Sequence, residues 1–126
     1  MNINLINFLI LLKNASLAKK ESIYCKYNRN FEKLLKVLYL EGIIQSYYII
    51  NSKSTIRIFF RYTQTISRLN LLKIISNPSK SCNISLKNLY KISEGQKVLV
   101  LSTSKGVLTS LKAKKNYVGG TLLFVC

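Results

Sequence analysis

Residues 97–109 read Lys-Val-Leu-Val-Leu-Ser-Thr-Ser-Lys-Gly-Val-Leu-Thr. The first five residues form a nearly continuous apolar run with the length and β-branched content of a buried strand. Three hydroxyl residues, a lysine and a glycine follow this run. Thr109 is a good N-cap, so a short helix is expected to begin after it. The segment therefore predicts a strand that leaves the core through a polar loop and enters a helix.

The residues on either side of this segment predict a mostly β lobe with a short helix. Pro78, the only proline, ends an apolar run that is expected to be a strand. Lys112, Lys114 and Lys115 make the short helix basic, and Gly119-Gly120 bends the chain into the last strand. The predicted elements are strands at 69–76, 82–84, 97–101 and 121–125, a helical turn at 86–90, a turn at 94–96 and the basic helix after Thr109.

The first half of the chain predicts a more helical lobe. Apolar residues recur every three or four positions in the first 17 residues, which indicates a helix with a broad buried face. Asn30 is expected to cap a second helix, whose apolar stripe runs from Phe31 to Leu38 and which Gly42 ends. Two β-like runs around a polar turn predict a hairpin. The predicted elements are helices at 3–17 and from 30, and strands at 22–26, 43–50 and 56–62, with the turn at 51–54.

These patterns together predict an α+β protein of two small lobes. Residues 1–64 form the N-terminal helix-strand-helix-strand-strand lobe, and residues 65–126 form the β-rich C-terminal lobe that carries the polar loop. The boundary is expected in 63–68, the least hydrophobic stretch of this region.

Charge is the strongest signal in the composition. Twenty Lys and Arg residues face four acids and no histidine, which gives a formal net charge of +16. The basic residues are spread from Lys13 to Lys115 and do not form a tail. So much self-repulsion implies a polyanionic partner, and the spread favours a folded body that lies on an extended array of phosphates.

The residue types that catalysis and metal binding need are scarce. Without histidine, neither a Ser-His nor a Cys-His nucleophile pair can form. The four glutamates lie at least nine positions apart, so a paired-carboxylate or two-metal site has no local support. Cys25, Cys82 and Cys126 lack metal-site spacing and are expected to be thiols in a reducing compartment. We expect no catalytic residue, no metal and no cofactor, with a nuclease as the disfavoured enzyme alternative.

A peripheral membrane protein is the main alternative, because the chain begins with an apolar run. That run has roughly ten positions, whereas a membrane-spanning helix needs about 20. A signal peptide carries its positive charges before the run, but the first one here is Lys13, after it. The run is therefore expected to be the first helix of the fold, with no presequence.

The hydroxyl-rich loop is the sharpest candidate for a binding site. Ser102, Thr103 and Ser104, with nearby backbone N–H groups, can bond to phosphates, 2′-hydroxyls or base edges in the shallow minor groove of RNA. Lys105 adds charge, and Gly106 permits close approach or a positive φ. From spacing alone, an ordinary turn whose hydroxyls cap the backbone explains the segment at least as well.

Some aromatic and arginine residues are weaker candidates. Three tyrosines could stack on bases, namely Tyr27, Tyr47 and Tyr48. Packing within the protein is the favoured role for them. Contact with nucleic acid and exposure on solvated strand faces are about equally favoured for three arginines: Arg57, Arg61 and Arg68.

Several segments, in order, resemble the bacterial-type ribosomal protein S-eight family of the small subunit. Residues 98–109 are similar to its signature segment nearly without interruption, and Ala113-Lys114 with Val118–Leu123 resemble the companion segment downstream. Lys13-Asn14-Ala15 is similar to the Arg-Asn-Ala of the family's first helix, and residues 33–44 resemble a segment with Val-Leu-Lys-Glu-Gly-Phe-Ile. The ordered matches cover almost the whole chain.

The resemblance implies a structural protein that binds directly to a helix in the central domain of small-subunit rRNA and supports subunit assembly. It implies neighbouring ribosomal proteins as partners, including the S-five family, with no membrane and no small-molecule substrate. The expected rRNA-binding residues are Ser102, Thr103, Ser104, Lys105 and Gly106 in the loop, Lys13 and Asn14 in the first helix, and Lys112 and Lys114 in the basic helix.

The residue choice gives a hint of the compartment. Sixteen lysines, 15 isoleucines, 12 asparagines and eight tyrosines all have A/T-rich codons. This bias is typical of organellar and other A/T-rich genomes. We therefore expect a mitochondrial ribosome, with a plastid or the bacterial cytoplasm as alternatives.

Overall fold

The computed structural model describes residues 3–50, 52, 54–64, 66–92 and 97–126. Contacts divide the chain into two compact units. The N-terminal unit is Asn7–Leu71, and the C-terminal unit is Leu72–Cys126 together with residues 3–6. The predicted turns at 51–54 and 94–96 include residues outside the described part of the chain.

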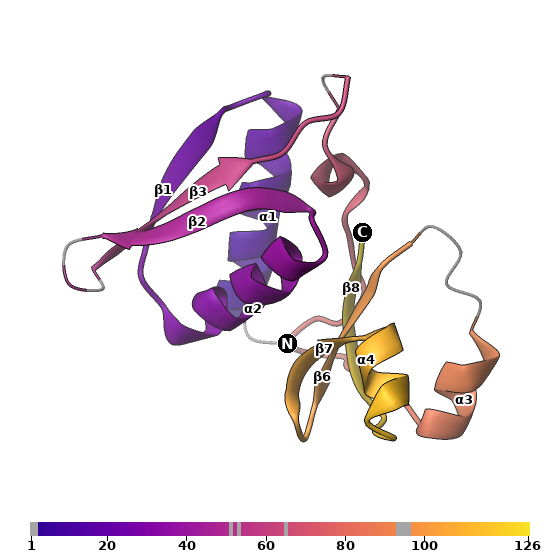
Figure 1. The fold of residues 1–126 in the computed structure, drawn as a ribbon. Helices are drawn as coiled ribbons and strands as arrows, with labels where there is room; N and C mark the ends of the chain where they lie inside the picture. Colours follow the sequence, from indigo (N-terminus) through magenta and orange to yellow (C-terminus); the bar gives the residue numbers. More distant parts are fainter. Residues whose placement is uncertain (1–2, 51, 53, 65, 93–96) are drawn as a thin grey trace. The chain divides into compact units, whose positions relative to one another are not determined.

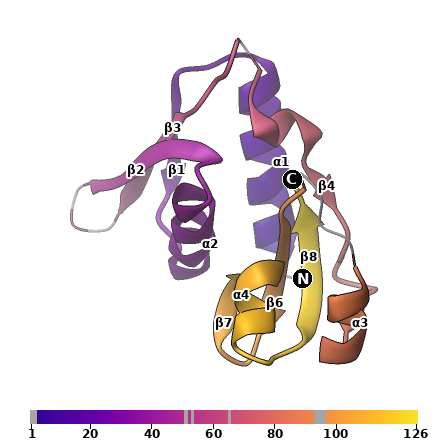
Figure 2. The ribbon, with the colours of Figure 1, turned by 45° about the vertical axis from the view of Figure 1, so that its right-hand side comes forward.

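The N-terminal unit confirms the predicted order of helix, strand, helix, strand, strand. Its elements are α1 (Ile3–Leu17), β1 (Ser22–Lys26), α2 (Arg29–Leu40), β2 (Ile44–Ile50) and β3 (Thr55–Phe60). The strands form an antiparallel sheet in the order β1-β3-β2. Both helices lie on the same face of this sheet (Figures 1 and 2).

The core of this unit follows from the alternation of side chains along β3. Ile56, Ile58 and Phe60 are buried, and the residues between them lie on the other face, since successive side chains of a strand point to opposite sides. Phe8 of α1 and Phe31 of α2 stack with their ring centroids 4.2 Å apart. One face of the sheet is therefore packed by helices, and the other stays open.

The ends of α2 show why this segment is a helix of this length. Asn28 is the N-cap, and its side chain accepts a hydrogen bond from the backbone N–H of Asn30. The predicted cap, Asn30, is therefore wrong by two residues. Gly42 follows the helix with φ +73°, in the left-handed region that favours glycine, so the predicted stop is confirmed.

The C-terminal unit is built around β8, which is paired on both sides. Its elements are β4 (Lys73–Ile74), β5 (Cys82–Ile84), α3 (Leu86–Lys91), β6 (Leu99–Thr103), β7 (Gly106–Thr109), α4 (Ser110–Lys115) and β8 (Gly120–Val125). The antiparallel sheet has the order β4-β8-β6-β7, and β5 also pairs with β8. Leu89, Leu101 and Ala113 are fully buried in its core, as expected for a β-rich lobe with short helices.

Two predicted elements are wrong in this half of the sequence. The strand expected at 69–76 is a 3-10 helix, η1 (Arg68–Leu71), followed by the two-residue β4. Leu69 is the only buried residue of η1, so the burial here does not alternate as it would in a half-buried strand. The loop expected to lead directly from strand to helix is also wrong, since β7 lies between them.

Candidate nucleic-acid interface

The segment 102–106, here called the hydroxyl turn, is the tip of a β-hairpin. Ser102 and Thr103 end β6, Ser104 and Lys105 form the two-residue turn, and Gly106 begins β7 opposite Thr103. Gly106 has φ +105° and open space around the position of a Cβ. Glycine is therefore needed there for its backbone conformation and not for room.

The three hydroxyls of the turn have different roles. Thr103 Oγ1 donates to the carbonyl of Gly106 at 2.8 Å and accepts from the backbone N–H of Lys105 at 3.2 Å. Ser102 and Ser104 are exposed, and neither hydroxyl has a partner among the described residues. Thr103 therefore fixes the shape of the turn, as the ordinary-turn alternative expected, while the two serines remain available to a ligand.

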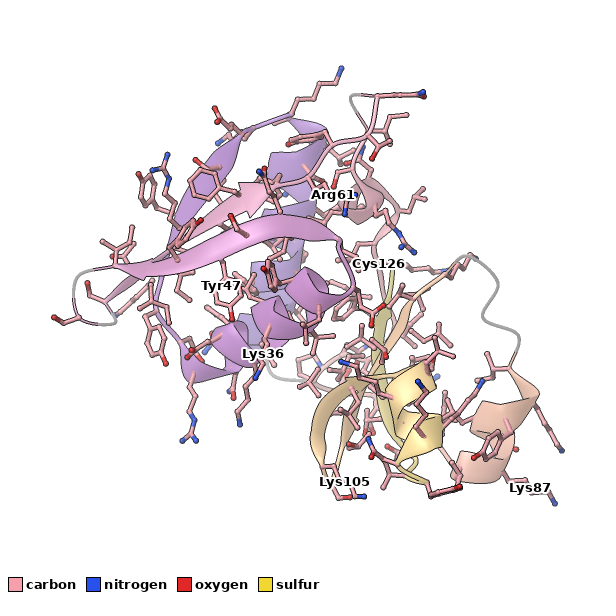
Figure 3. All side chains as sticks on the ribbon, in the orientation of Figure 1. Lys36, Tyr47, Arg61, Lys87, Lys105 and Cys126 are labelled. Carbon is pink, nitrogen blue, oxygen red and sulfur yellow. The ribbon has the colours of Figure 1, made fainter. Side chains whose placement is uncertain are left out.

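The basic residues of α4 lie next to this turn. α4 packs against both β6 and β7, and its N-cap is Thr109, as predicted, whose side chain accepts from the backbone N–H of Lys112. Lys105, at the tip of the hairpin in Figure 3, donates from Nζ to the carbonyl of Asn116 at 3.4 Å. Lys112 is exposed and Lys114 is half-buried. The basic helix thus packs against the two strands whose tip is the hydroxyl turn.

Gly119 and Gly120 allow the strands below the turn to approach closely. A Cβ at Gly120 would lie 2.3 Å from the carbonyl oxygen of Ser102, and one at Gly119 would lie 2.6 Å from that of Ile84. Real Cβ atoms do not approach backbone so closely. The glycine pair therefore sets the position of β8 against β6 and β5.

Sequence reasoning missed two polar residues that lie beside Ser102. Thr121 of β8 is paired with Ser102 of β6 on one side and with Asn83 of β5 on the other. Thr121 Oγ1 donates to Asn83 Oδ1 at 2.8 Å. Directly paired residues of antiparallel strands lie on the same face. Asn83, Thr121 and Ser102 therefore form a polar row that only the strand pairing reveals.

Every charged side chain among the described residues of this unit is positive. Residues 72–126 contain nine lysines, all described, and one acid, Glu94, which lies outside the described residues. No group of three or more His, Cys, Asp or Glu side chains that could hold a metal occurs in the described chain. The surface is therefore suited to phosphate and hydroxyl groups.

The remaining candidates lie in the N-terminal unit. Lys13 and Asn14 are on the last turns of α1, with Lys13 half-buried and Asn14 exposed. Tyr27 donates to Glu32 Oε2 at 2.6 Å, and this hydrogen bond raises the pKa of Tyr27. Tyr47 lies between β2 and α2 (Figure 3), where its ring meets that of Tyr39 edge-on. Tyr27 and Tyr47 thus have internal partners.

The predicted arginines occupy two places. Arg57 lies on the open face of the N-terminal sheet. Arg61 Nη1 donates to the carbonyl of Gly42 at 3.2 Å. Arg61 and Arg68 both line a pocket of about 470 Å³ within the N-terminal unit, together with Glu41 and Ser67.

Tyr117, at the end of α4, has a backbone conformation that disfavours its side chain. Its φ is +55° and its side chain is 76% exposed. A left-handed conformation costs a residue with a Cβ roughly 1–2 kcal/mol. We expect Tyr117→Gly to raise the free energy of unfolding by about 0.5–1 kcal/mol in urea denaturation, because glycine also gains entropy in the unfolded chain. Tyr117→Phe is the matched control and should change nothing; a loss of stability in Tyr117→Gly contradicts the argument.

No helix in the described part of the chain has the length and apolar character needed to span a membrane. No disulfide joins Cys25, Cys82 and Cys126.

Comparison with known proteins finds the same family throughout. The family model described as Ribosomal protein S8 matches residues 4–126. The small ribosomal subunit protein uS8 of Borrelia hermsii is 35% identical over 120 residues, covering 93% of this chain and 91% of the relative. The uS8c of Bigelowiella natans is 34% identical over 131 aligned positions, covering 98% of each chain. Members of this family are structural ribosomal proteins and not enzymes. The chain therefore belongs to the ribosomal protein S8 family of the small ribosomal subunit.

Proposed function

We propose that this protein binds small-subunit rRNA directly, in the central domain, and supports assembly of the small subunit and translation. The observation that carries the proposal is the hydroxyl turn. It presents two exposed serines with unused hydroxyls next to Lys105, at the tip of the hairpin against which the basic helix α4 packs. The neighbours would be other small-subunit proteins, including the S-five family.

In the proposed mechanism, the lysines supply most of the affinity for RNA and the hydroxyl turn supplies the selectivity. Lysines attract phosphates through counterion release, which is salt-sensitive and independent of sequence. Hydroxyls in a fixed turn can bond to 2′-hydroxyls and base edges in the wide, shallow minor groove of an RNA helix. Because Thr103 holds the turn from within, Ser102 and Ser104 meet the RNA already in position, and little ordering cost remains.

The proposed contacting residues combine the hydroxyl turn and its neighbours with the first-helix positions that the family resemblance implies. The C-terminal lobe, residues 65–126, would contribute most of them, and the N-terminal lobe, residues 1–64, would contribute α1. The proposed set is Ser102, Thr103, Ser104, Lys105, Gly106, Lys112 and Lys114, extended by Asn83 and Thr121, with Lys13 and Asn14 from the first helix. For the compartment we propose the mitochondrion, on the residue bias alone, with plastid and bacterial cytoplasm as the alternatives.

A filter-binding titration tests the proposal. The protein is titrated against the central-domain rRNA fragment and an unrelated RNA duplex of equal length, at two salt concentrations. Preference for the rRNA fragment that survives the higher salt is expected, since hydrogen bonds in a groove do not depend on counterions. Equal, salt-sensitive binding to both RNAs would reduce the protein to a general polycation and contradict the proposal.

Lys112 is exposed on α4 and is expected to contact a phosphate. Lys112→Ala should weaken binding to the rRNA fragment and to the unrelated duplex by a similar factor. It should also reduce the slope of log affinity against log salt by roughly 0.9, the value for one phosphate contact. Lys112→Arg keeps the charge and should keep the slope. A loss that affects the rRNA fragment alone would assign Lys112 to base or groove recognition instead.

A further inference from the structure

The open face of the N-terminal sheet carries a row of side chains that the hydroxyl turn does not involve. In the sheet register, Arg57 of β3 lies between Tyr24 of β1 and Tyr48 of β2. Phe59 lies two positions further along β3 on the same face. Tyr24 is 60% exposed and Tyr48 is 58% exposed. Two tyrosine rings are therefore accessible on either side of a central arginine.

The row is held together by ring and cation contacts. The guanidinium carbon of Arg57 lies 4.5 Å from the ring centroid of Phe59 and 5.2 Å from that of Tyr24. The rings of Tyr48 and Phe59 meet edge-on with centroids 5.7 Å apart. The guanidinium also donates to Ser22 Oγ at 3.4 Å. These contacts orient the side chains before any ligand arrives.

The charge on this face is not neutralised. The three strands contain no Asp or Glu, and Arg57 has no carboxylate partner among the described residues. Lys26 lies on the same face, two positions further along β1. A surface that combines exposed rings with unpaired cations is complementary to bases joined by phosphates.

We propose that this open sheet face is a second RNA-binding surface, which stacks unpaired nucleotides on Tyr24 and Tyr48 while Arg57 and Lys26 attract their phosphates. A twisted sheet with aromatic rings on its open face is a known means of holding two or three unstacked bases. The surface goes beyond the proposed function, because it lies in the other unit and takes single strands, whereas the hydroxyl turn takes the groove of a helix.

A protein partner is the rival occupant, since exposed tyrosine and arginine are also common at the centres of protein interfaces. The absence of acids from all three strands and the net charge of +16 favour RNA. So does membership of a family whose members work inside an RNA-rich particle. The test below separates the two occupants.

The experiment measures fluorescence anisotropy of the full chain with two labelled probes of eight nucleotides. One is single-stranded oligouridine, and the other is the same ribose-phosphate chain without bases. The variant is Tyr24→Leu with Tyr48→Leu, which removes the rings from exposed positions and should leave the fold intact. Tyr39→Leu, at an exposed tyrosine of α2 in the same unit, is the matched control.

We expect oligouridine to bind the unmodified protein at least tenfold more tightly than the abasic chain. The affinity for oligouridine should fall about tenfold for each tyrosine removed, and Tyr39→Leu should change neither affinity. Photo-cross-linking with a 4-thiouridine octamer should label peptides that contain Tyr24 or Tyr48. Equal affinity for the two probes, or unchanged affinity in the double variant, would overturn the proposal.

Two further outcomes are decisive. If the double variant binds oligouridine normally but no longer co-sediments with small subunits, the face binds a protein and the RNA proposal is wrong. A variant of the hydroxyl turn, Thr103→Ala with Ser104→Ala, should keep its affinity for oligouridine and lose its preference for the rRNA fragment. Failure of the sheet-face proposal is thereby distinguished from failure of the proposed function.

Discussion

Gly120→Ala is expected to lower the free energy of unfolding by roughly 2–3 kcal/mol, at the upper end of what forced overpacking costs. The new Cβ would lie 2.3 Å from the carbonyl oxygen of Ser102 and 3.0 Å from Thr103 Cγ2. The nearest atom is backbone, so no flexible side chain can move aside. Relief requires β6 and β8 to separate at the base of the hydroxyl turn. Specific binding to the rRNA fragment should therefore fall together with stability.

Urea denaturation followed by circular dichroism measures the loss, and Gly106→Ala provides a matched comparison. Gly106 lies in the same hairpin, but no atom lies within 4 Å of its Cβ position. Gly106→Ala should therefore lower the free energy of unfolding only through its backbone φ of +105°. For a residue with a side chain, this conformation costs about 1–3 kcal/mol. If Gly120→Ala proves as stable as the unmodified chain, the close approach of β8 to β6 cannot be what requires glycine.

The N-terminal unit could be predicted from sequence because its signals are local. The apolar period of α1 and the alternation in β1 and β3 are visible within a few residues. The bounds of α1 and β1 are those predicted, and β2 begins and β3 ends within two residues of the predicted positions. Asn28 was missed as the cap of α2 because Asn30, also a good cap, lies two residues later.

The C-terminal unit was less predictable because its strands are short and pair over long distances. The apolar run around Leu72 is compatible with a strand or a helical turn, and periodicity alone does not separate them. Val107 and Leu108 are too few to indicate a strand before Thr109. They become β7 because β6 offers an edge to pair with. Asn83 and Thr121 lie 38 residues apart in sequence. They belong to the candidate site only because β8 pairs with β5 on one side and with β6 on the other.

Replacing Thr103 and Ser104 together by alanine is expected to weaken specific binding to the rRNA fragment by roughly 1–3 kcal/mol, the scale of hydrogen bonds left unmade in an interface. Binding to an unrelated duplex should change little, because every lysine is retained and phosphate attraction depends on charge. The double variant should therefore lose selectivity more than affinity. Filter binding to both RNAs at the higher salt concentration measures this difference.

The single variants separate the two hydroxyls, because they have different partners. Ser104→Ala removes an exposed hydroxyl without a described partner, so stability should stay within about 0.5 kcal/mol and the loss should appear in binding. Thr103→Ala removes both hydrogen bonds inside the turn, so it should cost about 1 kcal/mol of stability and weaken binding through the shape of the turn. Ser79→Ala, at an exposed serine elsewhere in the same unit, should leave the preference for the rRNA fragment unchanged. If Ser104→Ala binds as tightly as the unmodified protein while Thr103→Ala does not, the turn acts only as a scaffold, and recognition must come from the polar row of Ser102, Thr121 and Asn83.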